Sequence, residues 1–144
     1  MSVPKGERRE SKVEFDNTYF KIFEDCVRLS VKGFGGREDL IKEYEPYVQT
    51  MQKEVITTVS EIGRNIRIAN SIYPTCKAEY EIRRISQEKA IGLCYDLLTK
   101  YQLVMKILKV KDNKYVEEIK NIRHEINCLK SWRTSDNKRY KDLG

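Results

Sequence analysis

The segment Asn70–Arg84, "NSIYPTCKAEYEIRR", decides the fold because it interrupts two long helical patterns. Pro74 disfavours a helical conformation in the residue before it, so the preceding helix must end there. Thr75 can cap the helix that follows, because Thr is a preferred residue at helix N-termini. The segment therefore predicts a short turn between two long helices that lie side by side.

Apolar residues on both sides of this turn repeat at alternating intervals of three and four residues, the pattern of an amphipathic α-helix. Two more series of the same kind occur nearer the chain ends, and no comparable run alternates with a period of two. We therefore expect four long helices and no strands. The four series are Phe15, Tyr19, Ile22, Cys26 and Leu29; Val48, Met51, Val55, Val59, Ile62, Ile66 and Ala69; Ile91, Cys94, Leu98, Tyr101, Met105 and Leu108; and Tyr115, Ile119, Ile122, Ile126 and Leu129.

Turn-forming residues mark the other boundaries. Glycines between Gly33 and Gly36 suit the end of the first helix. Pro46 suits the start of the second long helix, or the point where a short lead-in helix over about 38–44 hands over to it. Asp112 or Asn113 is expected as the N-cap of the last helix. All these connections are short.

Short connections join antiparallel neighbours, so the sequence predicts an all-α fold, an up-down-up-down antiparallel four-helix bundle with long second and third helices. A chain of 144 residues forms one domain by length, over residues 1–144. We expect mobile arms at about 1–12 and 135–144.

Several functional classes find no support in the sequence. The cysteines Cys26, Cys76, Cys94 and Cys128 have no CxxC spacing, and His124 is the only histidine, so we expect no zinc site. Cys26, Cys94 and Cys128 fall in apolar helical stretches and are expected as core filling. No nucleophile, phosphate-loop or dinucleotide motif occurs, so we expect a non-enzyme without metal or cofactor.

The beginning of the chain is charged, without a signal-peptide pattern, and no stretch has the length and apolarity of a membrane span. We therefore expect a cytoplasmic protein that does not bind a membrane.

The formal net charge of +6 is distributed unevenly along the chain. Residues 1–14 contribute +1, residues 60–90 contribute +2 and residues 130–144 contribute +3. The remaining ranges, 15–59 and 91–129, hold 13 basic and 13 acidic side chains and cancel. Because both termini and the middle turn meet at one end of such a bundle, the sequence predicts one basic pole, a surface suited to an acidic partner such as nucleic acid.

Arginine is prominent at this predicted pole, and guanidinium groups suit bidentate phosphate contacts. The predicted nucleic-acid-binding residues are Arg8, Arg9, Lys12, Arg64, Arg67, Lys77, Arg83, Arg84, Lys130, Arg133, Lys138 and Arg139. Tyr73, Tyr80 and Trp132 are possible stacking partners for unpaired bases.

Blander interpretations of the same residues stay open. The pole can be a solvated helix end closed by pairs such as Glu79–Arg83 and Glu81–Arg84. Trp132 can cap the core against the "IYP" turn instead of stacking on a base.

The third helix carries polar residues where its apolar series would continue toward the turn, notably Arg84 and Gln87. Such groups cannot be buried without partners. The sequence therefore indicates either a bundle that is open and wet at this end or contact with a second subunit, of which we favour the second.

Four motifs carry a resemblance to a known family. They are "SVPKGERRESK", "NSIYPTCKAEYEIRR", "QEKAIGLCYDLL" and "LKSWRTSDNKR". Together they resemble the bacterial four-helix-bundle family that includes proteins encoded in ribosomal RNA intervening sequences and the accessory variability determinant (Avd) proteins of diversity-generating retroelements. The added lead-in segment between Gly36 and Pro46 departs from the plainest pattern of that family.

The resemblance implies a homo-oligomer, a ring-like pentamer in the Avd branch. It also implies association with a retroelement reverse transcriptase and its template RNA, in support of mutagenic cDNA synthesis without catalysis by this chain. The sequence hypothesis is thus an accessory protein that binds RNA or DNA. The alternative is a protein-only interaction scaffold whose basic pole docks an acidic protein partner.

Overall fold

Helices account for nearly all of the chain in the computed structural model, which describes the backbone of residues 5–144 and the side chains from residue 17 onward. No strand occurs within that part of the chain. The elements in chain order are α1 (Lys5–Val31), the 3-10 turn η1 (Gly33–Gly35), α2 (Glu38–Glu43), α3 (Glu45–Ser71), α4 (Lys77–Ile107) and α5 (Val116–Arg139). The predicted all-helical fold class is confirmed.

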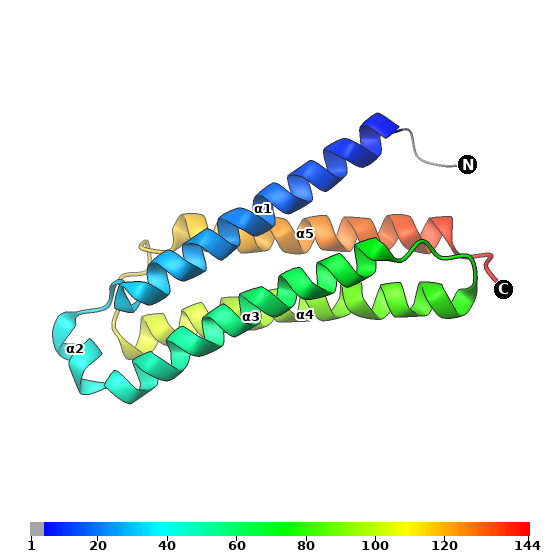
Figure 1. The fold of residues 1–144 in the computed structure, drawn as a ribbon. Coiled ribbons are helices and arrows are strands. Elements are labelled where there is room, and N and C mark those ends of the chain that lie inside the picture. The colour runs from blue at the N-terminus through cyan, green and yellow to red at the C-terminus, as the bar shows by residue number, and fades with distance from the viewer. Residues whose placement is uncertain (1–4) are drawn as a thin grey trace.

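The long helices pack along their lengths around one apolar core. α3 runs to a tight turn and α4 returns beside it, α1 contacts α3 and α5, and α5 also packs on α4 (Figure 1). The central series predicted from the sequence supply the core, with side chains such as Val59, Ile62, Leu98 and Ile122 buried. Toward its N-terminal end α1 diverges from α3 (Figure 1).

The lead-in helix occurs where the sequence predicts it. α2 covers Glu38–Glu43, and Pro46 lies in the first turn of α3, where its missing N–H costs no helical hydrogen bond. Within the described part of the chain, the main packing partner of α2 is α3. It therefore extends the start of α3, and Leu40 joins the common core.

The turn after α1 is held by a contact with the residue that immediately precedes α5. Gly33 and Gly35 adopt φ of 62° and 70°, the left-handed region that glycine tolerates. Phe34, between them, shares this conformation with φ 61° and is buried, and the Tyr115 hydroxyl donates a hydrogen bond to its carbonyl oxygen. The apolar ring and the tyrosine together hold the backbone in this turn.

Two predicted helix caps are wrong. Tyr115, not Asp112 or Asn113, is the N-cap of α5, because its buried ring packs 5.4 Å from that of Tyr101 and fixes where the helix begins. Cys76, not Thr75, is the N-cap of α4. A capping Thr75 would accept a hydrogen bond from a backbone N–H of α4. Instead, its own backbone N–H and its hydroxyl both donate to Glu79 Oε1, at 2.9 and 2.5 Å.

The segment 135–144, predicted as a mobile arm, is helical over its first half. α5 continues to Arg139, and Tyr140–Gly144 fold back so that the Gly144 carbonyl accepts a hydrogen bond from the Lys77 N–H at 2.9 Å. Of the predicted arm at about 1–12, residues 1–4 lie outside the described residues, and α1 already begins at Lys5.

Of the three cysteines predicted to fill the core, two are buried there. Cys26 and Cys94 are fully buried, whereas Cys128 is only half-buried. Burial raises the pKa of the Cys26 thiol to about 12, and it also raises the pKa of Cys94. Both buried thiols are therefore protonated at neutral pH and act as apolar filling.

Candidate nucleic-acid interface

The α3–α4 turn and the end of α5 meet at one end of the molecule (Figure 1). The contacts that join them include Lys77 with Gly144, the hydroxyl of Tyr80 with the side chain of Asn137, and an ion pair between Arg83 and Asp136. We call this end, residues 60–90 and 130–144, the basic pole. The described chain therefore brings together two stretches with formal charges of +2 and +3.

A buried ion pair lies at the centre of the basic pole. Arg83 is 6% exposed and Asp136 is 2% exposed. The Arg83 guanidinium makes a bidentate contact, with Nε 2.6 Å from Asp136 Oδ2 and Nη2 3.0 Å from Oδ1. Arg83 Nη1 also donates to the Ile72 carbonyl at 2.8 Å, and Gln87 Nε2 donates to Asp136 Oδ2 at 2.7 Å. Because the charges satisfy each other, they can remain in the core.

This ion pair corrects three predictions. Arg83 is not available to a phosphate, because Asp136 and the Ile72 carbonyl use its donors. Asp136 closes much of the polar seam of α4 within the chain, since it accepts from Arg83 and from Gln87 Nε2, although Gln87 Oε1 is buried without a hydrogen-bond partner. The Glu79–Arg83 surface pair does not form, because both partners are engaged elsewhere.

The aromatic side chains of the basic pole are mostly occupied. Trp132 is half-buried against the core, and the Arg83 guanidinium lies 5.0 Å from its ring centroid. Tyr80 is buried, and its ring lies 5.4 Å from that of Tyr140. Of the three predicted stacking residues, only Tyr73, 74% exposed in the α3–α4 turn, presents its ring to solvent. Trp132 thus takes the core-capping role and holds the end of α5 in place.

Two of the remaining arginines of the pole pair with acids of their own helix. Arg64 lies 3.6 Å from Glu61, and Arg84 lies 3.2 Å from Glu88, not from Glu81. The Arg64 side chain is exposed and that of Arg84 is partly exposed, and such surface pairs contribute little to stability. They can therefore exchange their carboxylate partners for a phosphate at small cost.

The other predicted cations divide by exposure. Arg133 is half-buried, and Lys130 donates to the Tyr95 hydroxyl at 2.7 Å. The exposed ones, for which no ion pair is found within the described part of the chain, are Arg67, Lys77, Lys138 and Arg139. The side chains of Arg8, Arg9 and Lys12 lie outside the described ones.

Most acids of the pole are buried or engaged by a neighbouring residue, whereas Asp142 is exposed. Asp136 is buried in its ion pair, and hydrogen bonds from Thr75 hold the pKa of the Glu79 carboxyl below its usual value. Because Arg83 is buried together with Asp136, the pair leaves the net charge of the pole unchanged, and the exposed side chains carry that charge. Because the exposed arginines and lysines of the pole lie on different helices, the surface suits an extended anion with several negative charges.

The chain matches no family model, no curated protein and no solved structure. Within the described residues, no group of three or more His, Cys, Asp or Glu side chains is arranged to hold a metal ion. None of the helices in that same part has the length and apolarity needed to cross a membrane.

Sequence reasoning missed the importance of Asp136, which entered only as one acid in a charge sum. The signal was present, because Asp136 continues the apolar series of α5 seven residues after Leu129, on the face that turns inward. A charged residue in such a series needs an opposite charge on a facing helix. Only the fold identifies Arg83, and not Arg84, as that charge.

Proposed function

We propose that this protein is a non-catalytic accessory protein that binds nucleic acid through its basic pole. The observation that carries the proposal is the asymmetry at the pole. Exposed cations come from both α4 and α5, and the buried Arg83–Asp136 pair between them adds no net charge. A patch with net positive charge on two rigid helices favours the phosphate backbone of RNA or DNA, which attracts such surfaces strongly at low salt.

The proposal has a wider form, which rests on the resemblance of the sequence to Avd proteins. In that form, the long helices α1, α3, α4 and α5 are an up-down-up-down four-helix bundle and the protein is cytoplasmic. It partners the reverse transcriptase of a diversity-generating retroelement and its template RNA, and supports mutagenic cDNA synthesis. A reverse transcriptase gene beside a template repeat in the genomic neighbourhood is the expected finding.

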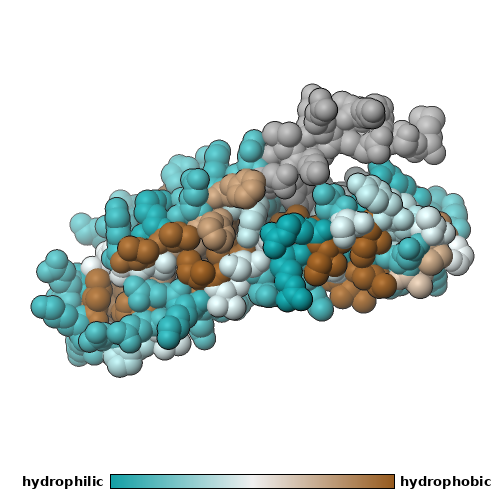
Figure 2. All heavy atoms as spheres, in the orientation of Figure 1, coloured by the Kyte–Doolittle hydropathy of each residue, from teal (hydrophilic) through white to brown (hydrophobic). Residues whose placement is uncertain are grey.

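Exposed apolar side chains support self-association as part of this proposal. In one view apolar residues reach the surface over the C-terminal parts of α1 and α3 (Figure 2). On α4, four exposed apolar residues lie near one helical face, namely Ile82, Ile85, Leu103 and Ile107. Exposed apolar surface of this kind marks protein contacts. Light scattering is expected to give a mass that is a multiple of 17.1 kDa, five-fold if the ring of the Avd branch is kept.

The direct test measures binding of fluorescently labelled RNA to the purified protein over a range of salt concentrations. Replacing Lys77, Lys138 and Arg139 with Gln is expected to weaken binding and to flatten the salt dependence, by roughly 0.7–0.9 in slope for each phosphate that is no longer neutralised. The matched control replaces Lys42 and Lys53, exposed lysines of α2 and α3 away from the basic pole, with Gln. Equal losses of affinity in both variants would contradict a role for the pole.

A protein-only scaffold is the second candidate, because the same exposed apolar residues suit a protein partner. In that case the pole docks an acidic protein. Absence of any RNA or DNA binding at low salt, together with intact folding, would favour this scaffold over the proposed function.

A further inference from the structure

Beyond its first turn, α5 carries two acidic residues, and the fold removes both from its surface. Between Ile119 and Lys141 the chain has two acids, Glu125 and Asp136. Glu125 is 0% exposed and Asp136 is 2% exposed, so both carboxyl groups lie inside the bundle. The solvent-facing side of this helix therefore carries only neutral and basic side chains over about its last five turns.

The solvent-facing residues of α5 recur at intervals of three and four, so they form one stripe along the helix. We call this stripe the α5 ridge: Lys120, Arg123, Asn127, Lys130, Thr134 and Lys138. From Lys120 to Lys138 it measures about 27 Å at the helical rise of 1.5 Å per residue. It extends the basic pole along the length of the molecule.

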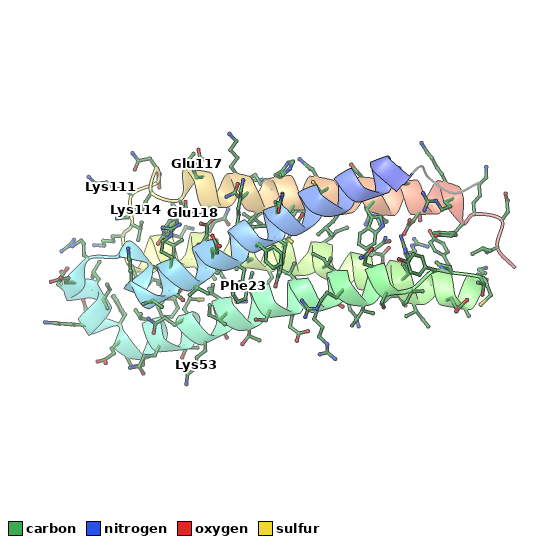
Figure 3. The ribbon with its side chains drawn as sticks, turned by 45° about the horizontal axis from the view of Figure 1, so that its top comes forward. Phe23, Lys53, Lys111, Lys114, Glu117 and Glu118 are labelled. Atoms are coloured by element: carbon green, nitrogen blue, oxygen red, sulfur yellow. The ribbon has the colours of Figure 1, made fainter. Side chains whose placement is uncertain are left out.

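The ridge has a defined start. Glu117 and Glu118 occupy the first turn of α5, beside Lys111 and Lys114 of the preceding turn (Figure 3). Glu118 lies 3.4 Å from Arg28. Two acids on the neighbouring helix α4 are engaged by their own neighbours, since Glu88 pairs with Arg84 and Asp96 with Lys100. The positive stripe is therefore bordered by charges that are largely compensated.

The ridge lacks what a single-stranded ligand would use. Proteins that bind single strands combine a basic groove with aromatic rings on which bases stack. Here the surface is the convex side of a helix, and the aromatic side chain beside it, Tyr95, has the Lys130 ammonium group 5.2 Å from its ring centroid. Asn127 and Thr134 add neutral side chains that can hydrogen-bond to phosphate oxygens.

We infer that the α5 ridge binds the phosphate backbone of a nucleic-acid double helix laid lengthwise along α5. This inference rests on the proposed function and adds the ligand class and its orientation. A stripe of about 27 Å spans on the order of eight base pairs at 3.4 Å per base pair. Contacts of this kind read backbone shape and charge and not base sequence.

The test compares three labelled ligands by fluorescence anisotropy: a 24-base-pair duplex, a 24-nucleotide single strand, and a hairpin with a 6-base-pair stem. The duplex and hairpin are made in both RNA and DNA versions, because the two share the phosphate chemistry. The ridge variant carries Lys120→Gln and Arg123→Gln, at the end of α5 remote from the basic pole. The pole variant carries Lys138→Gln and Arg139→Gln. The control variant carries Lys42→Gln and Lys53→Gln, and Lys53 lies on α3 on the side away from α5 (Figure 3).

The ridge variant is expected to bind the 24-base-pair duplex about tenfold more weakly, with the salt slope reduced by about 2, since it neutralises two fewer phosphates. The stem of the short hairpin spans about 20 Å, less than the distance of about 27 Å from Lys138 to Lys120, so it cannot contact both ends of the ridge, and its loss of affinity is expected to be smaller than that of the duplex. Circular dichroism and thermal melting check that all variants fold.

Two outcomes would overturn the inference while leaving the proposed function intact. One is a ridge variant that matches the control while the pole variant loses binding. The other is a single strand that binds more tightly than the duplex. If the wild type binds none of the three ligands at low salt, the proposed function itself fails.

Discussion

The two ends of the helical bundle are closed in different ways. At the end that holds η1, the buried groups are apolar or aromatic: Phe34, Leu108 and Tyr115 are fully enclosed, and Tyr101 packs on Tyr115. At the basic pole, the groups in the equivalent position are Arg83 and Asp136. The first end is held by packing, which tolerates small adjustments of angle and position.

The polar closure fixes geometry more strictly than the apolar one. The bidentate contact between Arg83 and Asp136 requires a particular rotation of α5 against α4, because the guanidinium offers its donors in a planar fork. A different rotation would leave a buried charge without its partner. The ion pair thus orients the end of α5, and with it the cations that the basic pole and the α5 ridge present.

The largest expected difference between the two ends is in thiol reactivity. Cys26, beside Tyr101 near the apolar end, is fully buried and its pKa is raised to about 12, whereas Cys76 at the pole is partly exposed. Thiolate is the reactive form, and an ordinary thiol has a pKa of about 8.5, so at pH 8 Cys26 is expected to react at least about a thousandfold more slowly. Alkylation followed by mass spectrometry gives both rates. Similar rates in the native protein would show that the apolar end opens readily.

Removal of one member of the buried pair is expected to have the next largest effect. Asp136→Ala leaves the Arg83 guanidinium buried without its counter-charge, which costs about 3–5 kcal/mol of unfolding free energy. Urea denaturation measures this loss. Asp142→Ala, at an exposed acid six residues later, is the matched control and is expected to stay within about 0.5 kcal/mol of the wild type. A small loss in Asp136→Ala would mean that water reaches the pair.

Replacing both members together sharpens the comparison. Arg83→Met with Asp136→Leu converts the polar closure into an apolar one, and such exchanges are often nearly neutral, so most of the stability missing in Asp136→Ala is expected to be recovered. If the pair orients α5, this stable double variant still binds the 24-base-pair duplex more weakly than the wild type does, although no surface cation has changed. Unchanged binding would restrict the ion pair to a purely structural role.

The smallest expected effect concerns the start of α4 at the pole. Hydrogen bonds from Thr75 lower the pKa of Glu79 from its usual 4.5, so the carboxylate contributes stability that is complete above that value. The contribution disappears as the pH falls through the lower pKa of the folded state. Glu79→Gln is therefore expected to melt slightly below the wild type at pH 7 and to converge with it in acid. A melting difference that does not change with pH would contradict this cap.

Much of the fold follows from sequence periodicity. The apolar intervals of three and four, together with Pro46 and Pro74, predict the long helices, the lead-in α2 and the turn at Ile72–Cys76. Helix boundaries were predictable only where local backbone chemistry sets them. At the start of α5 the buried ring of Tyr115 outweighs the capping preference of Asp112, and no local signal reveals that contact.

The candidate site was predictable in composition but not in detail. The charge sum places net positive charge in residues 60–90 and 130–144, and the fold brings these stretches together. The sum could not tell buried charges from exposed ones. It counted Arg83 as a phosphate ligand and treated residues 91–129 as neutral, although the buried position of Glu125 leaves Lys120 and Arg123 on a positive surface.

The sequence by itself determined that this chain is helical and where its turns lie, because helix formation depends on neighbours within four residues and on punctuation by Gly and Pro. The tertiary structure alone decided which charges reach solvent, because that depends on which helix faces which. Asp136 and Lys138 are two residues apart in one helix, yet packing buries the first against Arg83 and exposes the second. The positive surface of α5 results from this difference in burial.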